Sequence, residues 1–399
     1  MAIYLDYNAT TPVAKEVVDA LVPCLSENYG NPSSSYDLGR RAKAALDDSR
    51  ASVGTLLHAP PSSIVFMSGG TETINYVLKG MLTSKPYQRH IVTSVVEHVA
   101  VLATCRFLQA VHGFDVTYVP VDSDGRVSVD AVVAAIQPST CLVTIMHANN
   151  EVGTMQPLAA IATAARARHE ALCANQQDVY DPVLIHTDAS QSVGKVPVHV
   201  DELHVDFLTV AGHKLYAPKG VGALYIRPGT RPLQKLMHGA SHEQDLRAGT
   251  ENIPYAVALG RACQLAEHGL AHGLQKQLES LRRRLLDRLE SLLPDVDKRV
   301  NGAADNSLPN TLNISFRNIV APNVLQAVQD RVAASAGSAC HSHTTTASYV
   351  LQAMDIPLDY AYGTFRLSVG KYTTEDEVDS AADVLAGAIK TALASPRAT

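Results

Sequence analysis

One lysine in this chain stands where covalent chemistry with an aldehyde is favoured. Lys214 follows Phe207–Val210, a run of apolar and β-branched residues that predicts a buried strand. Burial disfavours the ammonium form of a lysine, and the neutral amine is the form that condenses with an aldehyde. A lysine after a strand is also commonly an ordinary solvated loop residue, so its position alone does not decide the chemistry.

A carboxylate that follows a second apolar run gives Lys214 a chemical partner. Asp188 comes directly after Val183–His186 and Thr187, a stretch that predicts another buried strand. A lysine that forms a Schiff base and an acid that keeps a pyridine nitrogen protonated are the groups that pyridoxal 5′-phosphate requires. The two residues together therefore predict a site for this cofactor.

Four short motifs strengthen this prediction through a resemblance. The motifs are Thr187–Gln191, Ala211–Lys214, Arg247–Thr250 and Gly337–Cys340. They resemble the pyridoxal-phosphate-dependent cysteine desulfurases and selenocysteine lyases, which are NifS-like members of the class V aminotransferase superfamily. The likeness extends from Tyr4–Pro12 to Arg366–Gly370 and so covers nearly the whole chain.

The resemblance implies an α/β fold of the fold-type-I pyridoxal-phosphate transferase kind, with a mostly parallel sheet in the large domain and a smaller α+β C-terminal domain. It also implies a homodimer. Because 399 residues are long for a single core, we expect two domains. The large cofactor-binding domain is expected at residues 16–256, and the small domain with the catalytic cysteine loop at residues 1–15 and 257–399.

A glycine- and threonine-containing turn is the expected phosphate site. Gly70 and Thr71 lie between a predicted strand and a predicted helix, where free backbone amides bind phosphate, although such turns also occur at ordinary strand-to-helix junctions. The resemblance implies that His213 adds a contact and that Thr250 adds another from a partner subunit. Ala211 stands where the family often has serine, so one hydroxyl contact is expected to be missing.

Three further polar residues follow predicted strands. His98 is either an ordinary histidine at a helix start or, as the resemblance implies, stacks on the cofactor ring and moves protons. Asn150 is either a turn residue or lies near the cofactor's phenolate oxygen and the substrate carboxylate, and Gln191 is implied to bond that oxygen. Since the carboxyl ends of parallel strands share one edge of a sheet, we expect these residues to lie together.

Two residues near the C-terminus are candidates for contact with the substrate. Cys340 lies in the small-residue stretch Ser335–His343, which suits a mobile nucleophile better than a core position, and His341 would favour its thiolate. The Cys-His-Ser-His spacing is also found in metal tracts, but no second ligand cluster accompanies it, so we predict no metal site. Arg366 either forms a structural ion pair or binds the amino-acid carboxylate with its planar fork, the use that the resemblance implies.

These residues predict an enzyme that removes sulfur from L-cysteine, or selenium from L-selenocysteine, and leaves L-alanine. The freed Lys214 would take the α-proton, and Cys340 would accept sulfur as a persulfide, which an acceptor protein could then receive. A selenocysteine-specific lyase is an alternative, because Ala211, the polar insertion at 172–182 and Cys340–Ser342 resemble those enzymes. Another class V activity would need no nucleophile at Cys340, and a non-catalytic sulfur-relay scaffold would need neither Lys214 nor Asp188.

Composition excludes several other classes of protein. The net charge of −6 argues against binding nucleic acid or an anionic membrane, and no apolar run is long enough to span a bilayer. The first residues lack the basic and apolar regions of a signal peptide, which indicates a cytoplasmic protein. Six scattered cysteines without a Cys-x-x-Cys motif form neither a disulfide framework nor a zinc ribbon.

Alternating strand and helix patterns are the elements that must position these residues. In the first part of the chain, strands are predicted at 64–67, 91–95, 116–119, 142–146, 183–186, 207–210 and 223–226, with helices at 37–57, 73–82 and 99–111. In the second part, helices are predicted at 275–293 and 324–331 and strands at 311–316 and 365–369. A final helix is predicted to begin at a capping box formed by Thr374 and Glu377 and to run to about Leu393.

Overall fold

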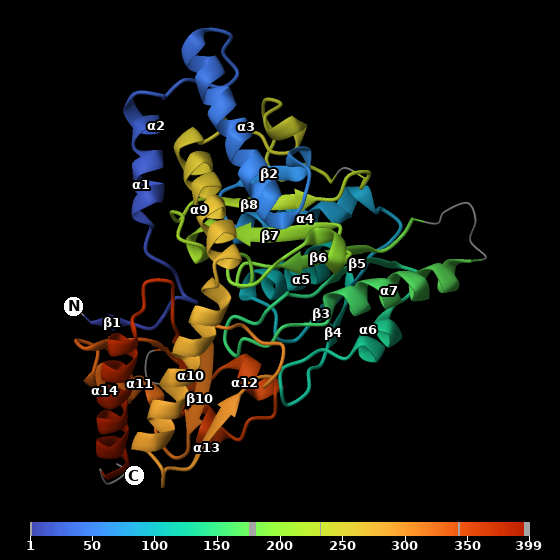
Figure 1. The fold of residues 1–399 in the computed structure, drawn as a ribbon. Helices are drawn as coiled ribbons and strands as arrows, with labels where there is room; N and C mark the ends of the chain where they lie inside the picture. The colour runs from blue at the N-terminus through green and yellow to red at the C-terminus, as the bar shows by residue number, and fades with distance from the viewer. Residues whose placement is uncertain (1, 175–180, 232, 342–343, 395–399) are drawn as a thin grey trace.

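The computed structural model describes residues 2–174, 181–231, 233–341 and 344–394, with the main chain alone at 338–341 and 344–345. Figure 1 shows a large sheet between helical layers in the upper part and a smaller sheet with its own helices below. Helices α9 (Ile253–Ala271) and α10 (Leu274–Leu292) run in succession from the upper part into the lower one (Figure 1). The beginning of the chain lies beside the lower part.

The large sheet has the mostly parallel character that the sequence predicts. Its strands are β2 (Ile64–Met67), β3 (His90–Ser94), β4 (Asp115–Val119), β5 (Thr140–Thr144), β6 (Leu184–Asp188), β7 (Phe207–Ala211) and β8 (Gly222–Ile226). They lie in the order β2-β8-β7-β6-β5-β3-β4. Strand β8 is antiparallel to both of its neighbours, and the other neighbouring pairs are parallel. The predicted α/β class is therefore confirmed.

Helices cover both faces of this sheet, which explains why its strands read as continuous apolar runs. One face packs against α3 (Asp37–Leu57), α7 (Leu158–Cys173) and α9, and the other packs against α4 (Gly70–Ser84) and α5 (Val99–His112). Successive strand residues alternate between the faces: Ile64 and Phe66 join the first core, whereas Val65 and Met67 join the second.

The lower part has a separate core on an antiparallel sheet. Its strands lie in the order β12 (Ser335–Ala336), β15 (Thr364–Ser368), β10 (Thr311–Phe316) and β9 (Lys298–Asn301). Helix α10 contributes a leucine stripe to this core, and α14 (Glu375–Ala394) packs beside it. Thr374 and Glu377 exchange hydrogen bonds at the start of α14, so the predicted capping box is confirmed.

The N-terminal arm belongs to this lower core. Strand β1 (Ile3–Tyr4) pairs in parallel with β11 (Val332–Ala333), and Leu5 is fully buried among the lower-core residues. Helix α9, by contrast, packs in the core of the large sheet. The packing therefore changes between α9 and α10, and the division predicted at residues 256 and 257 stays a prediction.

Two predicted elements are displaced for physical reasons. Strand β5 begins and ends two residues earlier than predicted, and the apolar run misplaced its end because Ile145 and Met146 stay buried beyond the last ladder pair. Helix α11 is found at Ala321–Ala327 rather than at 324–331, because Pro322 suits the first turn of a helix. The predicted insertion at 172–182 begins within α7, and its residues 175–180 lie outside those that the structure describes.

The remaining elements are short or peripheral. The helices are α1 (Lys15–Leu21), α2 (Pro23–Ser26), α6 (Val129–Ala135), α8 (Val200–Leu203), α12 (Tyr349–Ala353) and α13 (Leu358–Ala361), with 3₁₀ turns η1 (Pro61–Ser63), η2 (Gly212–Lys214) and η3 (Glu243–Asp245). A hairpin joins β13 (Ser338–His341) to β14 (Thr344–Ala347). Among the described residues, we find no helix with the length and hydropathy needed to cross a bilayer.

Candidate active site

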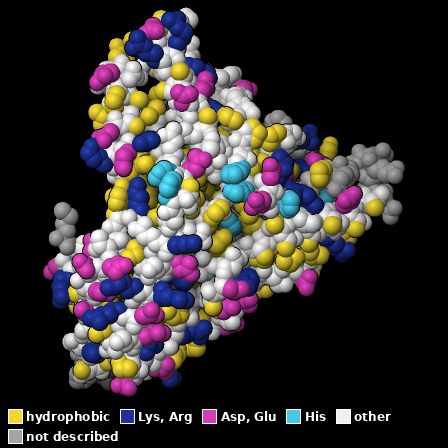
Figure 2. All heavy atoms as spheres, in the orientation of Figure 1, with side chains coloured by type: hydrophobic (Ala, Val, Ile, Leu, Met, Phe, Trp, Pro, Cys, Tyr) yellow, Lys and Arg dark blue, Asp and Glu magenta, His cyan; other side chains and the backbone are white. Residues whose placement is uncertain are grey.

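A cavity of about 320 Å³ opens at the carboxyl edge of the large sheet, next to the lower core. The predicted site residues that line it are Gly70, Thr71, His98, Asn150, Asp188, Gln191, His213, Lys214 and Arg366. On the face that Figure 2 shows, acidic and basic side chains are interspersed with hydrophobic ones, and several histidines lie across the middle. The structure thus brings together residues that the sequence spreads from position 70 to position 366.

Lys214 lies in η2, immediately after β7, and is largely shielded from solvent. Its Nζ donates hydrogen bonds of 2.6 Å to the main-chain oxygens of Asn8 and Ala9. Burial lowers the pKa of Lys214 to about 8, and the positive charge of Arg366 acts in the same direction. A substantial share of the amine is therefore neutral slightly above pH 7, as condensation with an aldehyde requires.

Asp188 is the last residue of β6 and lies on the same cavity. One of its carboxylate oxygens accepts a 2.9 Å hydrogen bond from the main-chain nitrogen of Ser190, which fixes the side chain at the strand end. Two residues before it, the ring of His186 is held between the hydroxyls of Thr144 and Thr209 at 2.8 and 3.0 Å. Burial lowers the pKa of His186 to about 4, so this ring is neutral near pH 7.

The first turn of α4 forms one end of the cavity. Its N-cap, Gly69, has a φ of 150°, a backbone conformation that side chains rarely tolerate, and Gly70 and Thr71 follow it. A Cβ atom on Gly70 would lie 3.3 Å from the hydroxyl oxygen of Ser190, which also lines the cavity. Free amides and hydroxyls at a helix start suit a phosphate. Ser190 was not predicted, and it supplies a hydroxyl close to Ala211, where the family often has serine.

His213 and His98 both line the cavity. The Nδ1 atom of His213 lies 3.1 Å from the hydroxyl of Thr10, and burial together with the Lys214 charge lowers the pKa of His213 to about 4. His98 caps helix α5, because its Nδ1 accepts a 3.1 Å hydrogen bond from the main-chain nitrogen of Ala100. The helix-start interpretation of His98 and its place in the cavity therefore both hold.

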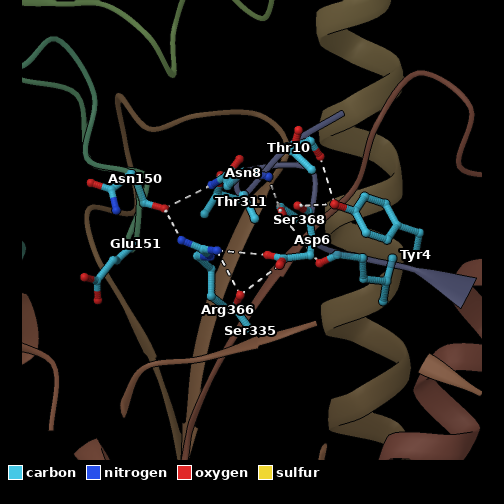
Figure 3. Close-up of polar contacts among 12 residues, drawn as sticks. Tyr4, Asp6, Asn8, Thr10, Asn150, Glu151, Thr311, Ser335, Arg366 and Ser368 are labelled. Atoms are coloured by element: carbon cyan, nitrogen blue, oxygen red, sulfur yellow. Dashed lines mark hydrogen bonds and ion pairs between the residues drawn. The ribbon is translucent and has the colours of Figure 1, made fainter. Parts of the chain in front are cut away.

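Arg366, on β15, lines the cavity where it meets the lower core, and Figure 3 shows its contacts at this end. One guanidinium nitrogen donates to the Asp6 carboxylate and to the Ser335 hydroxyl, both at 2.9 Å. The other terminal nitrogen donates to the main-chain oxygen of Asn150 at 3.2 Å. The predicted structural ion pair is therefore present, in a residue that also faces the cavity.

Two buried polar atoms at this end are left without a hydrogen-bond partner among the described residues: the Nε of Arg366 and the side-chain oxygen of Asn150. An unpaired buried donor or acceptor costs about 1–3 kcal/mol, so such atoms are expected where a ligand binds. Together with Lys214, Asp188 and the first turn of α4, they fit pyridoxal phosphate with an amino acid beside it.

Asn8, like Ser190, is a residue of this site that sequence reasoning missed. Its main-chain oxygen accepts from Lys214 and from the Gln191 amide, at 2.6 and 3.0 Å. Its side-chain amide donates to the hydroxyl of Thr311 at 2.8 Å and to the main-chain oxygen of Asn150 at 3.3 Å (Figure 3). Polar residues in an extended arm show no periodicity, so only the recognised Tyr4–Pro12 motif could have pointed to this position.

Two predicted site residues are not among those that line the cavity: Thr250 lies apart from it, and the side chain of Cys340 is not described. Thr250 is exposed, three residues after Arg247, which forms a 3.0 Å ion pair with Glu72 in the first turn of α4. The main chain of Cys340 lies in β13, opposite Thr345 of β14, and the predicted mobility of this stretch stays a prediction. The Cys340 thiol, like Ser342 and His343, lies outside the described part, and its role stays a prediction. Among the described residues, no metal-ligand cluster of three or more side chains occurs.

Comparisons with known proteins agree with this geometry. Residues 3–380 match the aminotransferase class-V family. Over 392 residues the chain is 41% identical to the cysteine desulfurase IscS of Dictyoglomus turgidum, with 96% of this chain and 93% of that protein covered. A solved NifS-like protein is similar with a TM-score of 0.88 at 35% identity, over 98% of this chain and 100% of the other. A structure of SspA in complex with cysteine is similar with a TM-score of 0.76 at 35% identity, over 94% of this chain and 100% of the other.

Proposed function

The chain belongs to the aminotransferase class-V family, and from this premise we propose that it is a cysteine desulfurase that binds pyridoxal 5′-phosphate and converts L-cysteine to L-alanine. The similar chains named cysteine desulfurase support the substrate, as does the similar structure of SspA with cysteine. The observation that carries the proposal is the shared cavity, in which Lys214 with its lowered pKa, Asp188 and the unpaired Nε of Arg366 lie together.

The residues of the cavity divide into those that would hold the cofactor and those that would hold the substrate. Gly70, Thr71 and His213 would hold the phosphate, Asp188 would pair with the ring nitrogen, and His98 would cover the ring. When bound, the cofactor draws electrons away from the substrate's α-carbon. Lys214 would bind the aldehyde carbon and, once displaced, accept the α-proton, since burial keeps a neutral fraction available near its pKa of about 8.

Arg366 and Asn150 would hold the α-carboxylate of the substrate through their unpaired atoms. The Cys340 thiolate would then attack the sulfur of the bound cysteine. An S–S bond forms as the substrate's C–S bond breaks, and the carbon keeps the electron pair and takes a proton, so that alanine leaves and a persulfide remains on Cys340. An acceptor protein would receive this sulfur. L-selenocysteine is the alternative substrate, because Ala211 and the Cys340–Ser342 motif resemble selenocysteine lyases.

The cofactor assignment is tested by trapping the lysine. Wild-type protein reduced with borohydride in the presence of the cofactor should carry the label on Lys214, and Lys214→Ala should carry none. Lys219→Ala is the matched control, because Lys219 is exposed in the same turn region and should leave the labelling unchanged. Labelling of any other lysine would contradict the assignment of Lys214.

The desulfurase assignment is tested at the cysteine. Cys340→Ala should release no alanine from L-cysteine and should lose the persulfide that mass spectrometry detects on wild-type Cys340. Cleavage of L-selenocysteine should persist in part, because selenium is more polarisable and depends less on a nucleophile. Buried Cys263 provides the control substitution, Cys263→Ala. Unchanged cysteine turnover in Cys340→Ala would favour a different class V reaction.

A further inference from the structure

A second lysine, Lys195, is buried behind the wall of the cavity. Its side chain is 7% exposed, and it lies in the segment that follows β6, four residues after Gln191. Its Nζ donates to the side-chain oxygens of Gln191 and Asn8 at 2.9 and 3.1 Å. Both acceptors are neutral amides, and both belong to residues that line the cavity.

This lysine is costly to bury. Burial, and then the positive charges of Lys214 and Arg366, hold the pKa of Lys195 well below its ordinary value. An apolar side chain of similar length would fill the same space without that cost. Stability alone therefore does not explain a lysine at this position. Its hydrogen bonds to the side chains of Gln191 and Asn8 offer an explanation.

The Nζ of Lys195 donates to both amide oxygens, and in its charged form it offers no acceptor to an amide N–H, so it favours the orientation in which the Gln191 oxygen faces it. The oxygen of the Gln191 side chain faces Lys195, and its NH₂ group must therefore point the opposite way. One N–H of that NH₂ donates to the main-chain oxygen of Asn8 at 3.0 Å. Because Gln191 lines the cavity, its second N–H is the donor that it can offer to a ligand there.

We propose that Lys195 is a positioning residue, which orients the Gln191 amide so that an N–H, and not the carbonyl oxygen, faces the ring oxygen of the bound cofactor. The proposal rests on the proposed function, because it assumes that the cavity holds pyridoxal 5′-phosphate. Lys195 itself touches neither cofactor nor substrate. It acts through Gln191, and the Asn8 side chain supplies its second acceptor.

The test compares the same substitution at two buried lysines. Lys195→Met removes the donors to Gln191, and Lys85→Met removes those of a lysine with 1% side-chain exposure, which bonds the main-chain oxygen of Pro182 just before β6, at the opposite edge of the sheet. Lys85→Met should lose thermal stability because it also breaks an ion pair with Asp181, whereas Lys195→Met should largely keep it, since methionine avoids the cost of burying a charge. Lys195→Met alone should weaken cofactor binding by roughly two- to tenfold, the value of one neutral hydrogen bond, and shift the visible absorption band.

A double-mutant cycle with Gln191→Ala tests whether Lys195 acts on cofactor binding through Gln191. In the Gln191→Ala background, Lys195→Met should change cofactor affinity by less than about twofold and leave the band in place, because the amide that it orients is gone. An effect of Lys195→Met that persists in this background overturns the inference, as does a Lys195→Met variant that behaves like Lys85→Met. A wild-type chain that binds no cofactor contradicts the proposed function, and the inference falls with it.

Discussion

The two ends of the cavity are built in opposite ways. At the phosphate end, the contacts that fix the backbone join close neighbours: the main-chain nitrogen of Ser68 donates to Glu72, and that of Ser190 donates to Asp188. At the carboxylate end, Arg366 contacts Asp6 and Asn150, which are 360 and 216 positions away in the sequence. The backbone at the phosphate end is therefore fixed by local turns, although long-range contacts such as that of His213 with Thr10 add to them, whereas the contacts of Arg366 depend on docking of the lower core and the N-terminal arm.

The difference also concerns charge. The phosphate end offers backbone amides, hydroxyls and a His213 ring whose lowered pKa keeps it neutral, so an incoming anion meets dipoles there. The carboxylate end holds a full charge that Asp6 already balances at 2.9 Å. Because the Nε of Arg366 has no partner among the described residues, a substrate carboxylate can bind without first displacing Asp6. Changes at one end should therefore affect cofactor affinity, and changes at the other should affect substrate affinity.

The largest effect that separates the two ends is expected at Arg366. Arg366→Ala should raise KM for L-cysteine by about 10- to 150-fold, the value of a charged hydrogen bond, and leave the visible band of the cofactor intact. Steady-state kinetics and titration with the cofactor measure the two quantities. Arg366→Lys keeps the charge and loses the planar fork, so its KM should lie between that of Arg366→Ala and that of the wild type. An unchanged KM in Arg366→Ala would contradict the assigned role.

A smaller effect, on the phosphate end alone, is expected at Thr250. We propose that this exposed residue completes the phosphate site of a partner subunit, so Thr250→Ala should weaken cofactor binding by roughly two- to tenfold without raising KM. Mixing Thr250→Ala subunits with Lys214→Ala subunits should restore tight binding in the mixed dimer, because the partner then supplies Thr250. Full activity in a dilute monomer would exclude this arrangement.

The smallest expected effect concerns the pH dependence of Lys214 and requires no substitution. Because the pKa of Lys214 lies at about 8 and not at its ordinary 10.5, acylation of this lysine in cofactor-free protein should rise with pH around 8. The same peptide in unfolded protein should show its rise near the ordinary value. By linkage, the buried charge destabilises the folded state below about pH 8, and this loss is relieved as pH rises toward 10.5. Equal midpoints in folded and unfolded protein would contradict the burial argument.

The two ends also differ in how far the sequence could predict them. Lys214, Asp188 and Gly70 follow buried strands whose apolar runs are visible in the sequence, so their place at one sheet edge followed from the parallel topology. Asn8 could not be found in this way, because its bonds to Ser368 and Thr311 depend on how the N-terminal arm lies against β10 and β15. Helix α9 escaped prediction because it is buried on much of its surface, which weakens the helical periodicity.

The 360 positions between Asp6 and Arg366 also fix an order of events during synthesis. A ribosome has completed Gly70, Asp188 and Lys214 well before it adds β15, so the large sheet can fold around its own site while the chain is still growing. The contact of Asp6 with Arg366 must wait for β15, and closing so long a loop carries an entropic cost that local turns avoid. A chain arrested before β15 would therefore already carry Gly70, Asp188 and Lys214 but would lack Arg366, the residue proposed to hold the substrate carboxylate.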